Sequence, residues 1–304
     1  MDGPFRIVSL VPNGTEILFA VGAGDRVVGV SHECDFPPAA RRLPILTGSA
    51  LPAGLSAAEV DQAVSAQVGG GASLYTLDEA RIAALAPDLI VTQQLCPVCA
   101  VSTAQVDGAV RPLPRCPELI SLDPRTLEDV FADILRVGAA TGRQSAAEEL
   151  VEELRHRLET VRRRVDERLS HSGRSAPVVP RVAALEWLDP PFAGGHWVPE
   201  MIRWAGGIDV FAEPGAHSAR LTWDRLRAAD PDVIVAMPCG FDEAGARAQI
   251  ELVAADPATS AEWRSLRAVR EGRVYPVDAN GCFSRPGPRL VDGVERLADL
   301  LDRR

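Results

Sequence analysis

The segment QQLCPVC, residues 93–99, places two thiols three residues apart, just after an apolar run that is typical of a buried strand. Thiols with this spacing can form a redox pair, supply half of a metal site or line a ligand cleft. A zinc ribbon needs a second CxxC, and a thioredoxin-like dithiol needs a Trp-Cys element at the start of a short helix. The sequence has neither, so we interpret Cys96 and Cys99 first as cleft wall, second as metal contacts and third as a redox pair.

Five of the six cysteines follow predicted strands, whereas Cys116 precedes one. Ligands of parallel α/β sheets bind outside the carboxyl ends of the strands, so these thiols are expected at the binding edge. The alternative for each is a small buried hydrophobic side chain. Thiolates suit a soft or borderline metal, and the candidate metal ligands are Cys34, Cys96, Cys99 and Cys239.

Aromatic and imidazole side chains fill the segment WLDPPFAGGHWVPE, residues 187–200, which follows a predicted strand. Flat rings on a loop stiffened by proline and glycine make apolar walls at low entropic cost, so Phe192 and Trp197 are predicted to contact a ligand. Trp187 fits a core anchor equally well. His196 is a candidate ligand or metal contact, and its alternative is a hydrogen-bonded loop histidine.

Two other predicted strand ends carry polar and aromatic side chains. His32 follows the strand at residues 27–30, and Asn280, Phe283 and Arg285 follow the strand at residues 274–278. The guanidinium of Arg285 could contact an acidic group on a ligand.

An internal repeat indicates which elements position these side chains. Residues 16–25 resemble residues 200–209, and residues 77–91 resemble residues 221–235. Apolar spacing predicts a helix in each copy, with a glycine stop in the first pair and an Asp78 or Thr222 N-cap in the second. Each later helix ends at a proline and leads into a buried strand, which predicts parallel α/β lobes.

The halves are separated by a predicted helical segment at residues 124–170. Gly138 and Gly142 are expected to break or kink it, and from Gln144 about 26 residues would form a rod of roughly 39 Å. We therefore predict an α/β fold with two Rossmann-like parallel-sheet lobes, residues 1–123 and 171–304, joined by a long α-helix. The glycines at residues 69–71 follow no strand and make no nucleotide-binding loop.

Composition excludes several classes of function. The 304-residue chain carries a net charge of −10, which argues against a nucleic-acid partner. All 32 basic residues are arginine, so lysine Schiff-base chemistry and the P-loop lysine are absent. The sequence lacks an apolar run long enough for membrane insertion and a signal-peptide pattern at its start. As written, it predicts a cytoplasmic protein with reduced thiols.

Sequence motifs of catalysis are also missing. The chain has no GxSxG elbow, no HExxH and no kinase set, so we predict that it is no enzyme and has no catalytic cofactor. Glu16 and Glu200 could form an acid–base pair across a cleft, but first-turn acids favoured by the helix dipole are the simpler interpretation.

Several segments in a shared order resemble a known family: residues 6–16, 27–38, 86–91, 189–195 and 284–289, which together span almost the whole chain. They are similar to the periplasmic cobalamin- and iron-chelate-binding proteins of ABC importers, in which two α/β lobes sit on a helical spine. The cobalamin-binding branch is most similar. The CPVC segment together with residues 196–200 resembles a CxxC-containing sub-branch.

The resemblance implies a ligand in an inter-lobe cleft, near Asn13, Asp35, Phe36, Phe192 and Phe283. It also implies an acid on each lobe that docks onto the transporter. Asp224 takes one of these positions, whereas the other falls on Ala80, beside Glu79. No tryptophan stands near residues 47–49, where the cobalamin binder has a stacking one. The family is typically periplasmic or at the cell surface.

These observations predict a solute-binding protein for a corrinoid (cobalamin-like) or similar metal chelate, serving an ABC permease or intracellular handling. The alternatives are a cytosolic thiol-rich metal-delivery protein and an enzyme acting on a metallocofactor in the same cleft. The candidate ligand contacts are Asn13, His32, Cys34, Asp35, Phe36, Cys96, Cys99, Phe192, His196, Trp197, Cys239, Asn280, Phe283 and Arg285.

Overall fold

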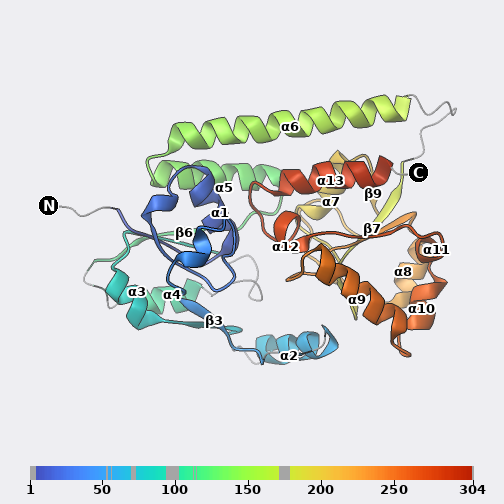
Figure 1. Ribbon diagram of the computed structural model, residues 1–304, viewed down its shortest axis with the longest axis horizontal. Helices are drawn as coiled ribbons and strands as arrows, with labels where there is room; N and C mark the ends of the chain where they lie inside the picture. The colour runs from blue at the N-terminus through green and yellow to red at the C-terminus, as the bar shows by residue number, and fades with distance from the viewer. Residues whose placement is uncertain are drawn as a thin grey trace. The chain divides into compact units, whose positions relative to one another are not determined.

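The structure is a computed structural model that describes residues 5–52, 54–55, 57–69, 73–93, 103–111, 113, 115–170 and 179–302. The chain forms two compact units (Figure 1). The N-terminal unit comprises residues 1–124 and 129–151, and the C-terminal unit comprises residues 125–128 and 152–304. Each unit is built on its own sheet with parallel strands, which confirms the predicted α/β fold class. The division at residues 123 and 170 remains a prediction.

The sheet of the N-terminal unit has four parallel strands in the order β2-β1-β5-β6. Its central pair is short and wholly buried, as expected for strands covered on both faces. The strand bounds are β1 Ile7–Ser9, β2 Val27–Val30, β5 Leu89–Thr92 and β6 Glu118–Ser121.

Helices follow these strands in the N-terminal unit. Ile82 and Val106 pack from α3 and α4 against Val8 and Ile90, so these two helices cover one face of the sheet. A separate antiparallel pair, β3 with β4, brackets α2 in the sequence. The bounds are α1 Pro12–Ala20, η1 Gly24–Arg26, η2 Ala40–Arg42, β3 Thr47–Ser49, α2 Ala57–Gly69, β4 Tyr75–Leu77, α3 Glu79–Leu85, α4 Thr103–Val110 and α5 Leu127–Ala140.

The C-terminal unit has a six-stranded mixed sheet in the order β10-β8-β7-β11-β12, with β9 also paired to β7. Strands β9, β7, β11 and β12 are parallel, whereas β8 and β10 form an antiparallel ribbon beside the end of β7. The bounds are β7 Arg181–Leu188, β8 Pro191–Ala193, β9 Ile208–Asp209, β10 Ala219–Arg220, β11 Val233–Ala236 and β12 Val274–Pro276.

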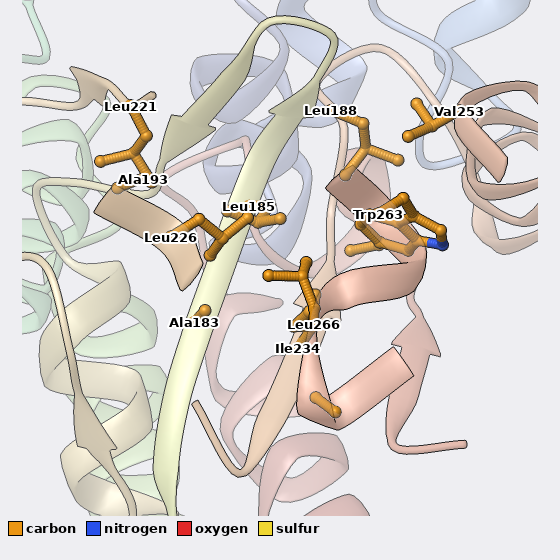
Figure 2. Close-up of a cluster of buried hydrophobic side chains, with 12 residues drawn as sticks. Ala183, Leu185, Leu188, Ala193, Leu221, Leu226, Ile234, Val253, Trp263 and Leu266 are labelled. Carbon is orange, nitrogen blue, oxygen red and sulfur yellow. The ribbon is translucent and has the colours of Figure 1, made fainter. Parts of the chain in front are cut away.

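Alternate residues of β7 and β11, Ala183 with Leu185 and Ile234 with Ala236, face one buried cluster on the same side of the sheet. Within this cluster, Figure 2 shows Leu221 and Leu226 to one side of β7 and Trp263 and Leu266 to the other. The helices are α7 Val198–Trp204, α8 Trp223–Ala229, α9 Glu243–Ala255, α10 Ser260–Ser265, α11 Arg267–Arg270, α12 Ala279–Cys282 and α13 Leu290–Asp302.

The predicted long helix is α6, Gln144–Ser170, which contributes residues to both units. It starts just after Gly142, whose φ of +64° is the left-handed conformation that ends the preceding helix. Gly138 was expected to break or kink the segment, and this is wrong. It lies inside α5, where the close approach of Ala147 leaves no room for a Cβ.

Arginines join the second part of α6 to α13 within the C-terminal unit. Arg157 donates to Glu295 and Asp292, Arg164 pairs with Asp299 at 2.9 Å, and Arg168 pairs with Asp302 at 3.4 Å. Hydrogen bonding to Glu295 raises the pKa of Arg157 further above its ordinary range. The pairs form a ladder of ions along the seam between the two helices.

The structure bears out the repeat. Gly22 and Gly206 have φ values of +76° and +79°, so both stop their helices in the left-handed conformation. Asp78 and Thr222 cap α3 and α8 by accepting the backbone N–H groups of Arg81 and Arg225. Glu16 departs from expectation, because α1 begins at Pro12 and puts this glutamate in its interior, 4% exposed.

A paired aspartate–arginine lock occurs once in each unit, at the Pro-Asp step after α3 and after α8. In the N-terminal unit, Asp88 accepts the backbone N–H of Arg6 at 2.9 Å, and the Arg6 side chain donates to the carbonyl of Leu85 at 2.6 Å. Asp232 accepts the N–H of Arg181 at 2.8 Å, and Arg181 donates to the carbonyl of Ala229 at 2.8 Å. Each lock sets the start of one central strand against its neighbour.

Among the described helices, none combines the length and the apolar character needed to cross a bilayer.

We expect Asp232→Ala to lower the free energy of unfolding by about 1–3 kcal/mol, because it leaves the N–H of Arg181 without its acceptor and removes one of the acceptors of the Arg267 guanidinium. Burial alone would raise the pKa of Asp232, but the N–H of Arg181 and the charge of Arg267 outweigh it and hold that pKa below its ordinary value. The loss should therefore shrink as the pH falls below about 4. Urea unfolding at several pH values measures it.

The matched control is Asp230→Asn, which weakens only an exposed pair with Arg267 and keeps a residue that tolerates the local φ of +42°. It should cost less than about 1 kcal/mol. Equal losses for the two variants would contradict the role given to Asp232.

Asp133 in α5 is 4% exposed, and burial raises its pKa from 3.8 to about 6 despite the hydrogen bond from Arg136. Between these values the folded state holds a proton that the unfolded chain has released, so stability should fall as the pH rises from about 4 to 6. Asp133→Asn should remove up to about 3 kcal/mol of this decline. Chemical unfolding at several pH values between 4 and 7.5 measures the free energy of unfolding. The control is Asp107→Asn, at an exposed aspartate. The same dependence of this free energy on pH in Asp133→Asn as in the wild type would refute the prediction.

Candidate functional site

The carboxyl edge of the N-terminal sheet brings the loops after β1 and β2 together. The backbone N–H of Ser31, after β2, donates to the carbonyl of Ser9 in β1 at 3.0 Å. The N–H of Leu10 donates to the carbonyl of Val91 in β5 at 2.8 Å. The predicted contacts Asn13, His32, Cys34, Asp35 and Phe36 therefore belong to one edge of one sheet, as the strand-end argument requires.

Cys34 lies in a buried hydroxyl cluster at this edge. Thr15 Oγ1 donates to Cys34 Sγ at 3.1 Å and lies 2.9 Å from Ser9 Oγ, and Cys34 is 5% exposed. Asn13 is beside it in α1, 2% exposed, and its Nδ2 has no partner among the described residues. A buried amide donor without an acceptor is costly, so Asn13 is the side chain here most in need of a polar partner.

His32 links the loop after β2 to the β3–β4 pair. Its Nδ1 lies 2.7 Å from Thr47 Oγ1, and its ring lies 5.7 Å from the ring of Tyr75. Thr47 and Tyr75 were missed from the sequence because neither belongs to a motif. Asp35 accepts from Arg41 through its backbone carbonyl, and Phe36 is 41% exposed, which is uncommon for so large an apolar ring.

Cys96 and Cys99 lie outside the described residues, so their assignments remain predictions. The four described cysteines are Cys34, Cys116, Cys239 and Cys282, and no disulfide joins any two of them. Within the described part of the chain, no three His, Cys, Asp or Glu side chains are grouped so that they could hold a metal ion. The assignment of Cys34 and Cys239 as metal ligands gains no support from their surroundings and remains a prediction.

Aromatic rings gather at the carboxyl edge of the C-terminal sheet. Trp187 of β7 lies opposite Phe192 of β8, and Phe192 lies opposite Arg220 of β10, so the three side chains form one cross-strand row. The Arg220 guanidinium lies 5.5 Å from the centre of the Phe192 ring. The ring of Trp187 is 6.3 Å from that of Phe241, and its Nε1 has no partner in the described chain.

Trp197 and Phe283 join two loops from inside the C-terminal unit. Trp197 Nε1 donates to the carbonyl of Phe283 at 2.7 Å, and the two residues are 6% and 2% exposed. Both residues are thus part of the buried interior of the unit, and their ligand contacts remain a prediction.

Asn280 and Arg285 are half-buried in the same segment as Phe283. Asn280 donates its backbone N–H to the carbonyl of Phe241 at 3.2 Å. Cys239 is exposed, and Ser284 Oγ donates to its thiol at 3.5 Å. The loops after β11 and β12 are thereby tied together, so their predicted contacts share one edge.

His196 forms a pair with His217, a residue that sequence reasoning missed. His196 Nε2 lies 3.2 Å from His217 Nδ1, and its ring lies 5.6 Å from that of Trp197. Burial, then the nearby His217 and Arg125, lower the pKa of His196. The sequence around His217 has no helical or strand periodicity. The only signal that could have marked His217 as a candidate is that histidine is scarce in this chain, which has 5.

The predicted docking acids lie on the first turns of equivalent helices. Glu79 is exposed on α3, and Asp224 is exposed on α8, where it pairs with Arg227. Glu79 is the first residue after its N-cap, Asp78, whereas Asp224 is the second residue after its N-cap, Thr222. Their docking role remains a proposal.

A model of the family described as "Periplasmic binding protein" matches residues 7–280. The vitamin B12-binding protein of Vibrio cholerae is 23% identical over 97% of this chain and 88% of its own length. An ABC transporter substrate-binding lipoprotein of Bacillus subtilis is 24% identical over 98% of this chain and 80% of its own. The periplasmic heme-binding protein of Roseiflexus sp. RS-1 has a similar fold, with a TM-score of 0.70, 23% identity and 98% coverage of both chains.

These findings overturn the expected cytoplasmic location. The matching family is periplasmic, and the relatives include a lipoprotein, so they point to an extracytoplasmic location. The expectation rested on the first residues of the sequence, and such an argument carries no information about processing or compartment. Reduced thiols, which were inferred from the cytoplasm, lose their support with it. The family model covers most of the chain, and the chain belongs to the periplasmic binding protein family.

Proposed function

We propose that the protein binds a corrinoid, such as cobalamin, or a similar metal chelate, and hands it to the permease of an ABC importer. The observation that carries this proposal is the aromatic row at the carboxyl edge of the C-terminal sheet, formed by Trp187 and Phe192 and extended by Phe241. Flat macrocycles present large apolar faces, and such faces stack well on rings.

Each unit carries a buried donor near the carboxyl edge of its own sheet. The Asn13 amide in the N-terminal unit and the Trp187 indole N–H in the C-terminal unit have no partner among the described residues. A corrinoid carries amide or carboxylate oxygens around its rim, and these are the acceptors such donors need. The relatives that bind vitamin B12 and heme agree with a planar metal chelate as ligand.

The proposal involves binding without chemical change, because the relatives are binding proteins. Glu200 is engaged elsewhere: its Oε2 accepts the backbone N–H of Leu127, the first residue of α5, at 2.8 Å. Exposed acids on equivalent helices, Glu79 and Asp224, fit a docking role toward basic residues of a permease.

We expect Phe192→Ala to weaken cobalamin binding roughly tenfold, a loss of about 1.4 kcal/mol, because it removes one ring of the stacking surface. Titration followed by visible absorbance or calorimetry measures the dissociation constant.

Phe211→Ala is the matched control. Phe211 also has an arginine over its ring, Arg225 at 5.7 Å, but it follows β9, which pairs with the start of β7 at the opposite end of the strand. When measured at a temperature at which Phe211→Ala is folded, its affinity for cobalamin should equal that of the wild type. Equal weakening by both substitutions would count against a site at the aromatic row, and no binding of any corrinoid or heme by the wild type would refute the proposed function.

A further inference from the structure

We infer that His217 supplies an axial nitrogen to the metal of the bound chelate, with His196 holding its ring in the required tautomer. This inference rests on the proposed function and names how the same site would grip its ligand. The chemistry is that of a metal in a planar macrocycle with one exchangeable axial position, which a cobalt corrinoid and an iron porphyrin share.

The backbone around the two imidazoles is fixed. The N–H of His196 donates to the carbonyl of Ala216 at 2.5 Å, and the N–H of Gly215 donates to the carbonyl of His196 at 2.8 Å. A Cβ at Gly195 would lie 2.6 Å from the backbone carbon of His217, so only glycine allows this approach. His196 itself has a φ of +53°, which non-glycine residues rarely adopt. The pair is thus a built feature of the loop.

The imidazole pair continues the ribbon that carries the aromatic row. Ala219 pairs with Ala193 and Arg220 pairs with Phe192, and the bonds between His196 and residues 215–216 extend this pairing beyond the strands. The histidines are therefore a few residues from Phe192 on one continuous two-stranded element. A chelate stacked on the row has its metal at its centre, within reach of a side chain farther along the ribbon.

The two rings have unequal roles. His196 is half-buried, with its ring 5.6 Å from that of Trp197, and its Nε2 points to His217. His217 is exposed, and its Nδ1 faces that atom at 3.2 Å. With the proton on Nδ1, the lone pair of His217 is on Nε2, on the other side of the ring from the hydrogen bond to His196. Metal-ligating histidines are commonly oriented in this way, by a hydrogen bond from the other ring nitrogen.

A bare ion is a poorer match for the pair. The described residues group no three ligating side chains, whereas protein sites for borderline ions usually use three or four. A metal in a macrocycle already has four equatorial nitrogens and needs only one axial donor. In the proposed step, His217 Nε2 donates its lone pair to the metal and a bound water leaves, with no change in oxidation state.

The test uses three probes on the whole protein: diaquocobinamide, a corrinoid with exchangeable water on both faces; dicyanocobinamide, whose faces are blocked by cyanide; and ferric heme. Wild type should bind diaquocobinamide or heme with an absorbance shift typical of nitrogen ligation. His217→Ala should lose that shift, and free imidazole should restore it. His196→Ala should keep the shift but weaken ligation about 10- to 100-fold. Binding of dicyanocobinamide should be the same in all variants.

His156→Ala is the matched control, because His156 is another exposed histidine, on α6, and it should change nothing. An unchanged spectrum in His217→Ala overturns the inference while corrinoid binding still supports the proposed function. A shift that depends on His217 with heme alone supports the inference and removes the corrinoid from the proposal. Binding of none of the three probes by the wild type overturns both.

Discussion

The arrangement of both sheets depends on the hydrogen bond between one carboxylate and one backbone N–H at the start of a central strand. Asp88 and Asp232 each follow a proline that ends a helix. Asp88 accepts the N–H of Arg6, just before β1, and Asp232 accepts the N–H of Arg181, the first residue of β7. This bond fixes the height of one strand relative to its neighbour. Because side chains alternate along a strand, a slip of one residue would reverse which side chains face the core and which loops emerge at the carboxyl edge.

The side chains that follow the strands determine the chemistry of each carboxyl edge. In the N-terminal unit the edge is polar and compact, with the Thr15 hydroxyl in contact with both Ser9 and Cys34. In the C-terminal unit the sheet continues into the β8–β10 ribbon, and β10 is the edge strand of this sheet among the described residues. Rings, a guanidinium and two imidazoles line this ribbon, and a ligand surface on it can change through substitutions that leave the parallel core intact.

The fold was largely predictable from the sequence because its signals are local. The Pro-Asp steps, the caps at Asp78 and Thr222 and the glycine stops at Gly22 and Gly206 each depend on a few adjacent residues. Gly138 was misread because its reason is a neighbour across a helix pair, Ala147, and not its own propensity. The interior position of Glu16 was missed for a similar reason: Pro12, at the first helical position, starts α1 earlier than the apolar pattern suggested.

The site was less predictable, because contacts distant in sequence decide it. Strand-end reasoning proposed His196 and Phe192 as ligand contacts, which remains a prediction. It could not show that the Trp197 indole would donate to the carbonyl of Phe283 or that His217 would meet His196. The tie between His32 and Thr47 likewise depends on the placement of the β3–β4 pair. Pattern identifies which side chains reach an edge, and only the fold decides which of them are free to bind.

The ladder of ion pairs between α6 and α13 affects the pH range over which the C-terminal unit is stable. Its cationic members are all guanidinium groups, since the chain has no amine side chain to offer. A guanidinium keeps its proton well beyond the point at which an ammonium group releases one. In strongly alkaline surroundings this seam should therefore retain its attraction, where the same seam built with lysine would become neutral on one side and open.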